Sequence, residues 1–575
     1  MTIIGIDLGT TNSAVAYWDG NQTRLIPNKL GKLITPSVVG LDQEGDITVG
    51  AIALDRLITH PDKSVSQFKR WMGTSREVQL GTNCMRAEDL SSFVLKSLLE
   101  DVKTALEAPV EHLVISVPAY FSDHQRKSTI AAAKLAGVSV TRLVNEPTAA
   151  ALSYGLNEKG DGKYVVLDLG GGTFDVSILD KYDGIMEIKA CAGDNNLGGE
   201  DFTDFLVNWL LQKNKIELNK LDVRQCAILR RFAESLKCDL STYQEKEYEL
   251  TIGEYKLKGE ITREKFEKDA FHLVSRIRAP VERALRDSRV APSEISQVIL
   301  VGGATRMPLM RKLASRLFSL IPLTLLDPDH IVAHGAAVQA ALIAEAKGIE
   351  DIIMTDVCPY TLGTAVVDET SRLKEIVISP IIERNAAIPI SRVERYVTAN
   401  NNQTRIIIDV YQGEQLKPQD NVKIGEVEIQ VPPAEKGREA VDVRFTYDIN
   451  GNLEVEVTVL STSEKTVQYF QGGSGQLSDE EIAGRFASLN AIKKTPRDQM
   501  ENRALIAYAE RLYAESTGEL REVLRTARSN FILKVEDQQN RNAALDRKEF
   551  SEFLQSIEQS MFGYLRSDDG HEDND

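Results

Sequence analysis

Hydrophobic and polar positions divide the chain into three stretches with different periods. From residue 1 to about 347, short apolar runs alternate with amphipathic segments, which is typical of α/β architecture. The predicted buried strands are 114–117, 165–169 and 298–301, and the predicted helices are 124–136, 201–214 and 308–320.

The pattern changes to a period of two after about residue 357. Residues 453–459 alternate apolar and polar side chains, and so do residues 426–431. This alternation indicates half-buried antiparallel strands, and Asn450-Gly451 between two such runs indicates a tight hairpin. We therefore expect a compact β-sandwich over about 357–470.

A glycine-rich break at 472–475 separates this region from helical, charge-rich sequence. Ser478 has the type and position of an N-cap, and Glu481 completes a capping box. Helical sequence is expected over 476–566. The tail, 567–575, is acidic, and its composition predicts a solvated disordered end.

The length, net charge, cysteine content and apolar runs of the chain restrict the class of protein to which it can belong. The chain has 575 residues, too many for a single core, and its net charge of −17 argues against nucleic-acid binding. Five scattered cysteines without CxxC spacing fit free thiols in a reducing compartment. Because Ile3 already begins a predicted strand and no run of about 18 apolar residues occurs, we expect no signal peptide, no membrane span and a cytoplasmic location.

An internal duplication is the most informative feature of the sequence. Residues 3–15 and 164–176 each read as an apolar strand, the triplet Asp-Leu-Gly, a small polar turn and a second strand. A repeat at this separation predicts two related lobes that face each other.

The residue types in both copies predict a phosphate site. Glycine lets backbone N–H groups approach an anion closely, and threonine adds a hydroxyl donor. Asp7 and Asp168 end their strands, where carboxylates can hold Mg²⁺ through its water shell. A single Asp-Leu-Gly is better read as a tight turn, but a turn does not require the aspartate in both copies. The expected phosphate contacts are Gly9, Thr10, Thr11, Asn12, Gly170, Gly171, Gly172 and Thr173.

A third element, residues 298–308, joins a buried strand through Gly302-Gly303 to a helix start. It reads as an ordinary strand-to-helix turn or, beside the duplicated loops, as the place where a nucleoside lies on exposed backbone. No GxxxxGK[ST] motif occurs, so the chain is not a P-loop NTPase. Residues 145–151 and 334–341 are small enough to let two helices cross closely and slide, although they also suit an ordinary core.

The ordered set of motifs resembles the DnaK-type heat-shock chaperone family. The motifs are IDLGTTNS, VPAYF, NEPTAAALSYGL, LDLGGGTFDVS, GDNNLGGEDF and VILVGGATRMP. IDLGT alone is shared with sugar kinases and other actin-like proteins, whereas the whole set is specific to the chaperones. The resemblance covers about residues 1–470 well and the C-terminal helices weakly, and the short chain suggests a specialised HscC-like member.

The resemblance implies a multidomain fold and a function. The implied parts are an actin-like α/β ATPase domain with duplicated lobes (1–347), a linker (348–356), a β-sandwich substrate-binding domain (357–470), an α-helical lid (476–566) and the tail (567–575). Such a protein is an ATP-dependent molecular chaperone, an ATPase whose ATP/ADP and Mg²⁺ cycle controls capture and release of extended apolar polypeptides. The implied partners are unfolded clients and a J-domain co-chaperone, and the protein is expected to be mainly monomeric.

The family also implies roles for nucleotide-site residues. Lys69 matches the lysine that orients the attacking water, although from the sequence alone it reads as a surface lysine. The residues that would position water and metal are Glu146, Asp175 and Thr173. The expected nucleoside contacts are Glu234, Lys237, Ser241, Gly302, Gly303, Arg306 and Asp329.

Coupling residues are implied in the same way. Pro118 and Arg126 match the network that reports nucleotide state, and Arg142, Asn145 and Asp356 match positions that couple to J-domain partners. Apolar linker residues either form an ordinary strand or dock on the ATPase in one nucleotide state; they are Ile352, Ile353 and Met354. Thr355 replaces the family's leucine.

The implied peptide cleft lies in the β-sandwich. Its residues are Thr364, Val367, Tyr396, Val397, Ala399, Ile406 and Ile408. Core packing explains the alternation of Ile406 and Ile408 equally well. Val367 stands where DnaK-like proteins carry methionine, which predicts a changed choice of peptide.

Two segments, 73–90 and 248–260, are shorter than in the family's main members. Since the second lies where an exchange factor would grip, we expect weak dependence on a GrpE-type factor. His330 and His334 have a zinc-compatible spacing without a third ligand, so a solvated or core helix face is favoured.

Two other functions share some of these features. A sugar or small-molecule kinase would have the duplicated phosphate loops but not the β-sandwich and helical region. A filament-forming actin-like protein is the structural alternative, against which the β-sandwich also argues.

Overall fold

The computed structural model describes most of the chain. The described residues are 2–155, 161–182, 185–323, 327–346, 353–368, 374–471, 500–516, 518–536 and 542–562, with isolated positions between 484 and 493. Backbone contacts divide the chain into two compact units, Met1–Ser478 and Asp479–Asp575. The predicted boundary near residue 357 falls inside the first unit, so the boundaries proposed from the sequence stay predictions.

The first lobe is built on a mixed sheet with the order β11-β10-β1-β2-β3. Its strands are β1 (Ile3–Leu8), β2 (Asn12–Trp18), β3 (Thr23–Leu25), β10 (His112–Val117) and β11 (Arg142–Asn145). Strand β1 pairs in parallel with β10 and antiparallel with β2. Nearly every residue of β1 and β10 is buried, which explains their continuous apolar runs.

The second lobe repeats this topology in the order β17-β12-β13-β14-β18. Its strands are β12 (Gly162–Leu169), β13 (Phe174–Tyr182), β14 (Ile185–Asp194), β17 (Ile295–Val301) and β18 (Ile353–Thr355). Strand β12 pairs in parallel with β17 and antiparallel with β13, as β1 does with β10 and β2. The duplicated sequence therefore forms equivalent strands in two sheets, which the repeat predicted.

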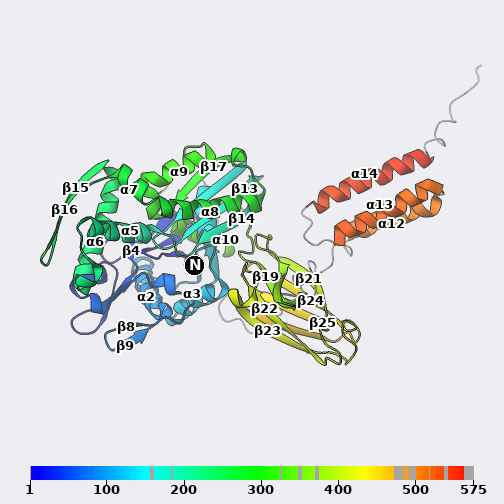
Figure 1. The fold of residues 1–575 in the computed structure, drawn as a ribbon, viewed down its shortest axis with the longest axis horizontal. Helices are drawn as coiled ribbons and strands as arrows, with labels where there is room; N and C mark the ends of the chain where they lie inside the picture. The colour runs from blue at the N-terminus through cyan, green and yellow to red at the C-terminus, as the bar shows by residue number, and fades with distance from the viewer. Residues whose placement is uncertain are drawn as a thin grey trace, which may run out of the picture. The chain divides into compact units, whose positions relative to one another are not determined.

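Helices cover both sheets (Figure 1). The larger ones are α2 (Ala87–Leu106), α3 (Asp123–Leu135), α5 (Gly199–Lys213), α6 (Val223–Thr242), α8 (Phe271–Ser288) and α9 (Pro308–Phe318). Helix α8 packs on β13 and β14, and α9 contacts β17. The helices predicted near 124–136, 201–214 and 308–320 are confirmed within two residues at each end.

Smaller elements complete the two lobes. They are β4 (Thr35–Pro36), β5 (Val38–Leu41), β6 (Ile47–Val49), α1 (Ala51–Thr59), β7 (Ser64–Ser66), β8 (Val78–Leu80), β9 (Asn83–Met85), β15 (Glu245–Ile252), β16 (Tyr255–Thr262) and α7 (Arg263–Asp269). The two short segments noted in the sequence form the hairpins β8–β9 and β15–β16.

Helices α4 (Glu146–Gly155) and α10 (Ile331–Ile343) cross at close range. A Cβ added to Gly335 would lie 1.7 Å from the carbonyl oxygen of Ala149. On the other side, a Cβ on Gly5 would lie 2.1 Å from the backbone nitrogen of Ala337. The close crossing predicted from small residues is confirmed, but Asn145 belongs to β11 rather than to the helix, because it still pairs with Val117.

Residues 362–470 form two four-stranded antiparallel sheets, β20-β19-β22-β23 and β21-β24-β25-β26. The strands are β19 (Leu362–Val367), β20 (Ile376–Ile382), β21 (Ile390–Val397), β22 (Arg405–Gln412), β23 (Val422–Gln430), β24 (Ala440–Tyr447), β25 (Leu453–Val459) and β26 (Lys465–Phe470). Their inner faces share one apolar core, and Asn450-Gly451 lies in the β24–β25 hairpin as predicted.

The linker segment adds a strand to the second lobe. Strand β18 pairs in parallel with β14, in the register Ile353 to Ile185 and Thr355 to Glu187. Ile352 lies outside the described residues. The β-sandwich is thus tied by backbone hydrogen bonds to the sheet that also contains Asp168 and Asp175.

The described residues of the second unit include the helices α12 (Met500–Glu515), α13 (Gly518–Glu536) and α14 (Ala543–Phe562). They share an apolar core in which the rings of Phe531 and Phe550 stack with centroids 4.2 Å apart. Most of the predicted helical start around Ser478 and the whole acidic tail, 567–575, lie outside the described residues.

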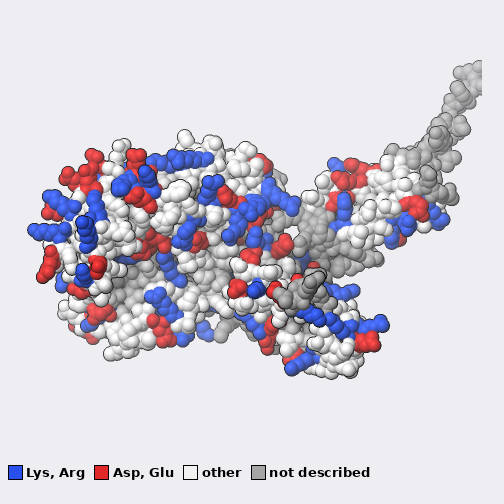
Figure 2. Space-filling view, viewed as in Figure 1, with Lys and Arg blue, Asp and Glu red and all other residues white. Residues whose placement is uncertain are grey.

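Charges of both signs are mixed over the face of the molecule seen in Figure 2. Among the described helices, none is both long and apolar enough to cross a bilayer. The cytoplasmic location and the lack of nucleic-acid binding stay predictions.

Candidate nucleotide site

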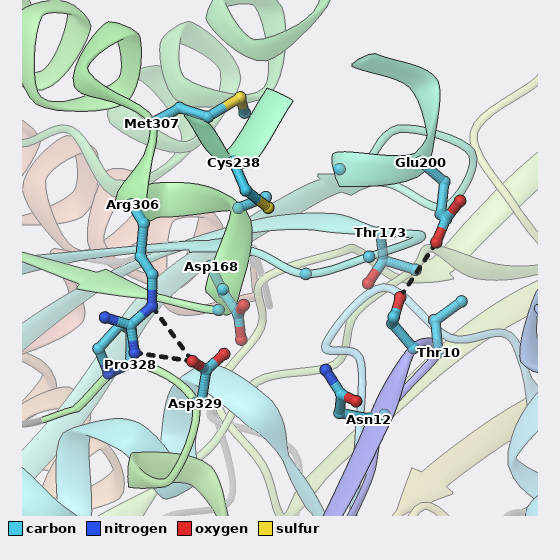
Figure 3. A pocket seen from close by; sticks show the side chains of 18 of the residues that line it. Thr10, Asn12, Asp168, Thr173, Glu200, Cys238, Arg306, Met307, Pro328 and Asp329 are labelled. Atoms are coloured by element: carbon cyan, nitrogen blue, oxygen red, sulfur yellow. Dashed lines mark hydrogen bonds and ion pairs between the residues drawn. The ribbon is translucent and has the colours of Figure 1, made fainter. Parts of the chain in front are cut away.

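A cavity of about 900 Å³ lies between the two lobes and contains almost all predicted nucleotide-site residues. The predicted residues that line it are Asp7, Gly9, Thr10, Thr11, Asn12, Lys69, Glu146, Asp168, Gly170, Gly171, Thr173, Glu234, Lys237, Ser241, Gly302, Gly303, Arg306 and Asp329. Gly172 and Asp175 are not in its lining, although Gly172 lies between the lining residues Gly171 and Thr173, and Asp175 stands opposite Asp168 in the β12–β13 pair. Figure 3 shows side chains from the two lobes converging on this cavity.

The two duplicated loops face each other at the floor of the cavity. A Cβ on Gly171 would lie 1.9 Å from the Thr11 hydroxyl, and one on Gly172 would lie 2.7 Å from the Thr10 side chain. Gly198 approaches Gly171 just as closely, and Gly199 donates its N–H to the carbonyl of Gly170 (2.9 Å). Glycine is therefore required for two backbones to meet, as a site for phosphate oxygens needs.

Four carboxylates and one lysine occupy the centre of the site. Asp168, Asp175, Glu146 and Lys69 are buried, and Asp7 is partly buried. Burial and the neighbouring Glu146 raise the pKa of Asp7 to about 7 and that of Asp175 to about 8. Burial also raises the pKa of Asp168 well above its usual range. A cluster with this excess of negative charge is suited to hold a divalent cation.

Lys69 is held in place by an ion pair. Its Nζ lies 2.7 Å from Oε1 of Glu146, and 5% of the lysine side chain is exposed. The same ammonium lies 5.7 Å from the centre of the Phe121 ring. Because burial and pairing fix the lysine, the surface position that its local sequence suggested is wrong.

Helix α6 supplies one wall of the outer cavity. Lys237 Nζ donates to Oε2 of Glu234 (2.6 Å) and to the carbonyl oxygen of Gly199 (2.9 Å). Ser241, one turn later, donates to the carbonyl oxygen of Lys237 (3.3 Å). The spacing of three and four residues places these side chains on one face of the helix.

The double-glycine turn supplies a second part of the cavity wall. Gly302 has φ 82°, and a Cβ there would lie 2.4 Å from the carbonyl oxygen of Leu169. The guanidinium of Arg306 binds Oδ2 of Asp329 at 2.7 Å and thereby lies along the cavity rim (Figure 3). A planar cation held this way can stack on a planar base.

Several residues of the site were not singled out from the sequence, although Glu200 and Asp201 lie within the motif GDNNLGGEDF. Glu200 accepts from Gln67 (2.6 Å) and forms an ion pair with Arg230 (2.6 Å), and Arg70 pairs with Asp201 (2.6 Å). The contacts of Gln67 and Arg70 join the first lobe to α5, and the pair with Arg230 joins α5 to α6. Cys238, Arg311 and Lys312 also line the cavity.

The predicted coupling residues form a continuous chain behind the site. Arg126 donates to Oδ1 of Asn145 (2.6 Å), and Asn145 donates to Oδ2 of Asp356 (2.8 Å). Arg126 also donates to the carbonyl of Ala119, immediately after the buried Pro118. Arg142 is set apart from this chain, since its guanidinium donates to the carbonyl of Ile449 in the β-sandwich (3.3 Å).

Some of the predicted peptide-binding residues are exposed to solvent, and others are buried. Val367 and Val397 are 41% and 55% exposed, whereas Ile406 and Ile408 are buried in the core of the sandwich. Burial fits the packing interpretation of the two isoleucines. The hydroxyls of Tyr396 and Ser379 are 3.0 Å apart, and Ala399 donates its N–H to Gln403. Thr364 is buried, with no hydrogen-bond partner for its hydroxyl among the described residues.

The two histidines do not form a metal site with other described side chains. His334 Nδ1 lies 2.8 Å from the hydroxyl of Thr23, and His330 precedes α10. The described group with metal-like spacing is the exposed loop Asp42, Glu44 and Asp46, which is remote in sequence from both histidines.

Comparison with known proteins agrees with this geometry. The family model "Hsp70 protein" matches residues 3–83 and 75–562. The chain is 36% identical over 586 aligned residues to "Chaperone protein DnaK" of Thermotoga neapolitana, covering 98% of this chain and 97% of the relative. It is 39% identical over 495 residues to the protein of the same name from Thermosipho africanus, covering 84% and 81%. The chain belongs to the Hsp70 family.

Proposed function

We propose that this protein is an ATP-dependent molecular chaperone that hydrolyses ATP in the cavity between its lobes and thereby controls a grip on extended apolar polypeptides. The observation that carries the proposal is the meeting of two glycine-threonine loops over a buried lysine and four carboxylates. The family assignment supports chaperone function, and it does not favour the sugar-kinase alternative.

The loops would hold the phosphates, and the two outer walls would hold the nucleoside. Backbone N–H groups of the glycines and the hydroxyls of Thr10, Thr11 and Thr173 are the donors that phosphate oxygens need. Helix α6 and Arg306 both line the outer cavity, where they could contact a base and ribose.

The residues fit a magnesium ion. Asp7 and Asp168 end equivalent strands, and Oδ2 of the buried Asp175 has no partner among the described residues. When bound, Mg²⁺ would neutralise charge on the phosphates and carboxylates. Asp7 and Asp168 would hold it through its waters.

The chain's own residues provide the remaining chemistry. Lys69, fixed by Glu146, would stabilise the charge that develops on the transferred phosphoryl group. Asp175 could accept a hydrogen bond from the attacking water through its free oxygen, and Thr173 could orient the same water. Pre-positioned charges in a buried site are effective because they need not reorganise during the reaction.

The β-sandwich would grip the client. Val367 and Val397 expose apolar surface near the ends of β19 and β21, which suits alternate apolar side chains of an extended peptide. The chain Arg126–Asn145–Asp356 would link this domain to the ATPase and to a J-domain partner. Dependence on an exchange factor is expected to be weak because the β15–β16 hairpin is short.

An ATPase assay with Lys69→Ala tests the proposal. We expect slow basal turnover in the wild type, stimulation by an extended apolar peptide, and loss of about 10²–10³-fold in hydrolysis by the variant with ATP binding retained. Lys29→Ala is the matched control, because Lys29 is an exposed lysine paired with Glu100. A wild type that phosphorylates a sugar and ignores the peptide would overturn the proposal.

A further inference from the structure

A tyrosine of the β-sandwich lies directly against the nucleotide-binding lobes. Tyr360 precedes β19, and its hydroxyl donates to the backbone carbonyl of Tyr120 at 2.7 Å. The two rings lie against each other in a tilted arrangement, with centroids 4.3 Å apart and planes inclined by 39°. Tyr120 itself belongs to the loop between β10 and α3.

The backbone of Tyr120 connects this contact to the nucleotide site. Its N–H donates to Oδ1 of Asp175 at 3.2 Å, while its carbonyl accepts from Tyr360 and from Asn195 (2.7 Å). One residue is therefore bound on one side to a carboxylate of the site and on the other side to the β-sandwich.

Asp175, Gly193 and Tyr120 are packed tightly against one another. A Cβ on Gly193, in β14, would lie 2.7 Å from Oδ1 of Asp175 and 3.0 Å from the Cβ of Tyr120. The glycine allows the loop to press on the carboxylate. A small shift of the Tyr120 loop must therefore move or release Asp175, because a close-packed interior transmits displacement.

We propose that Tyr360 is a positioning residue for ATP hydrolysis, whose hydroxyl sets the place of Asp175 through the backbone of Tyr120. The contact exists only while the β-sandwich lies against the Tyr120 loop of the first lobe, so it makes hydrolysis depend on the position of that domain. The proposal rests on the proposed function, since it assumes that capture of a peptide moves the sandwich.

Other contacts between these parts do not have this property. Arg384, which also pairs with Glu414 of the sandwich at 2.6 Å, pairs with Asp287 of α8 at 2.7 Å, and Gln412 accepts from the backbone N–H of Asp123 at 2.9 Å. These interactions hold the sandwich in place, but neither of them contacts a carboxylate of the nucleotide site. Among the contacts described across this interface, the Tyr360 hydroxyl is the one whose partner residue also binds Asp175.

The test is Tyr360→Phe in the full chain, which keeps the ring and removes the donor. Peptide-stimulated and basal ATPase rates give a stimulation ratio, and we expect this ratio to fall about two- to tenfold, the effect of one hydrogen bond. ATP affinity and melting temperature should stay at wild-type values. Tyr411→Phe, in β22 of the same sandwich, is the matched control and should leave the ratio unchanged.

Hydrogen–deuterium exchange of β18 separates positioning from simple loss of docking. In the ATP-bound Tyr360→Phe variant we expect β18 to remain as protected as in the wild type. An unchanged stimulation ratio would overturn the proposal, and so would a reduced ratio accompanied by loss of β18 protection. Absence of peptide stimulation in the wild type would instead overturn the proposed function, independently of the variant.

Discussion

The duplicated loops have the same sequence pattern, yet their glycines serve different contacts. In the first loop, a Cβ on Gly9 would lie 2.0 Å from the carbonyl oxygen of Asn12, within the same turn. In the second, Gly171 and Gly172 instead meet Thr11 and Thr10 of the opposite loop. The first loop needs glycine to fold on itself, whereas the second needs it to approach its partner.

The carboxylates of the two copies differ as well. Asp7 accepts a hydrogen bond from Ser116 at 2.8 Å, and Ser116 is its register partner on β10. The register partner of Asp168 on β17 is Val301, which offers no side-chain donor. On β13, Asp168 stands opposite Asp175, and burial together with Glu146, Asp175 and Asp7 raises its pKa. The second copy therefore has the less compensated charge.

The largest expected effect concerns the strands that carry these aspartates. In the duplicated sequence, Gly5 of β1 aligns with Val166 of β12. The first copy has glycine at this position because α10 lies on β1, so that a Cβ would clash with the helix. Gly5→Ala should lower the free energy of unfolding by about 3 kcal/mol, the upper range for over-packing, since the clash is with helix backbone. Urea denaturation measures this. Gly170→Ala is the control, because a Cβ there would have no neighbour closer than 3.8 Å.

Replacing Asp7 or Asp168 with asparagine should raise the Mg²⁺ requirement of the ATPase to different extents. Asp168→Asn should raise the Mg²⁺ concentration needed for half-maximal ATPase activity by about 100-fold, and Asp7→Asn by about 10-fold, within the range for groups that act through bound water. The physical reason is that the amide oxygen introduced by Asp7→Asn can still accept from Ser116, which keeps the side chain oriented. If Asp7→Asn raised the Mg²⁺ requirement as much as Asp168→Asn or more, the charges around the two aspartates would not determine the size of the effect.

A rescue experiment distinguishes the two uses of glycine. Gly171→Ala should weaken ATP binding about tenfold, and adding Thr11→Ala should recover most of the loss by removing the atom in conflict. The same second change should not help Gly9→Ala, whose conflict is with a backbone oxygen. Calorimetric titration with ATP gives all four affinities. Recovery of ATP affinity in both glycine variants would contradict the proposed difference between the contacts of Gly9 and Gly171.

Much of the nucleotide site could be predicted because its parts are local in sequence. The Asp-Leu-Gly loops and the Gly302-Gly303 turn are continuous motifs, so their glycines, threonines and aspartates line the cavity as expected, with the exception of Gly172. The buried position of Lys69 could not be derived from its neighbours, because it depends on Glu146, 77 residues away. The family resemblance, rather than any local pattern, identified that lysine.

Contacts between distant segments were the part that the sequence did not reveal. Gln67 and Glu200 are 133 residues apart, and Tyr360 and Tyr120 are 240 apart. Glu200 and Tyr120 lie within the motifs GDNNLGGEDF and VPAYF, but nothing in these motifs indicates the partner of either residue. Their importance comes from the register of two sheets and the packing of the β-sandwich, which periodicity does not specify.

The three-residue pairing of β18 with β14 also has a consequence for self-association. Without β18, β14 would be the outermost strand of its sheet, and an unpaired strand edge can recruit strands from other molecules. Charged side chains on β14 oppose this, since Glu187 and Lys189 form an ion pair there at 2.7 Å. Strand β18 therefore covers the edge of the sheet, and the charged side chains of β14 oppose aggregation when β18 dissociates.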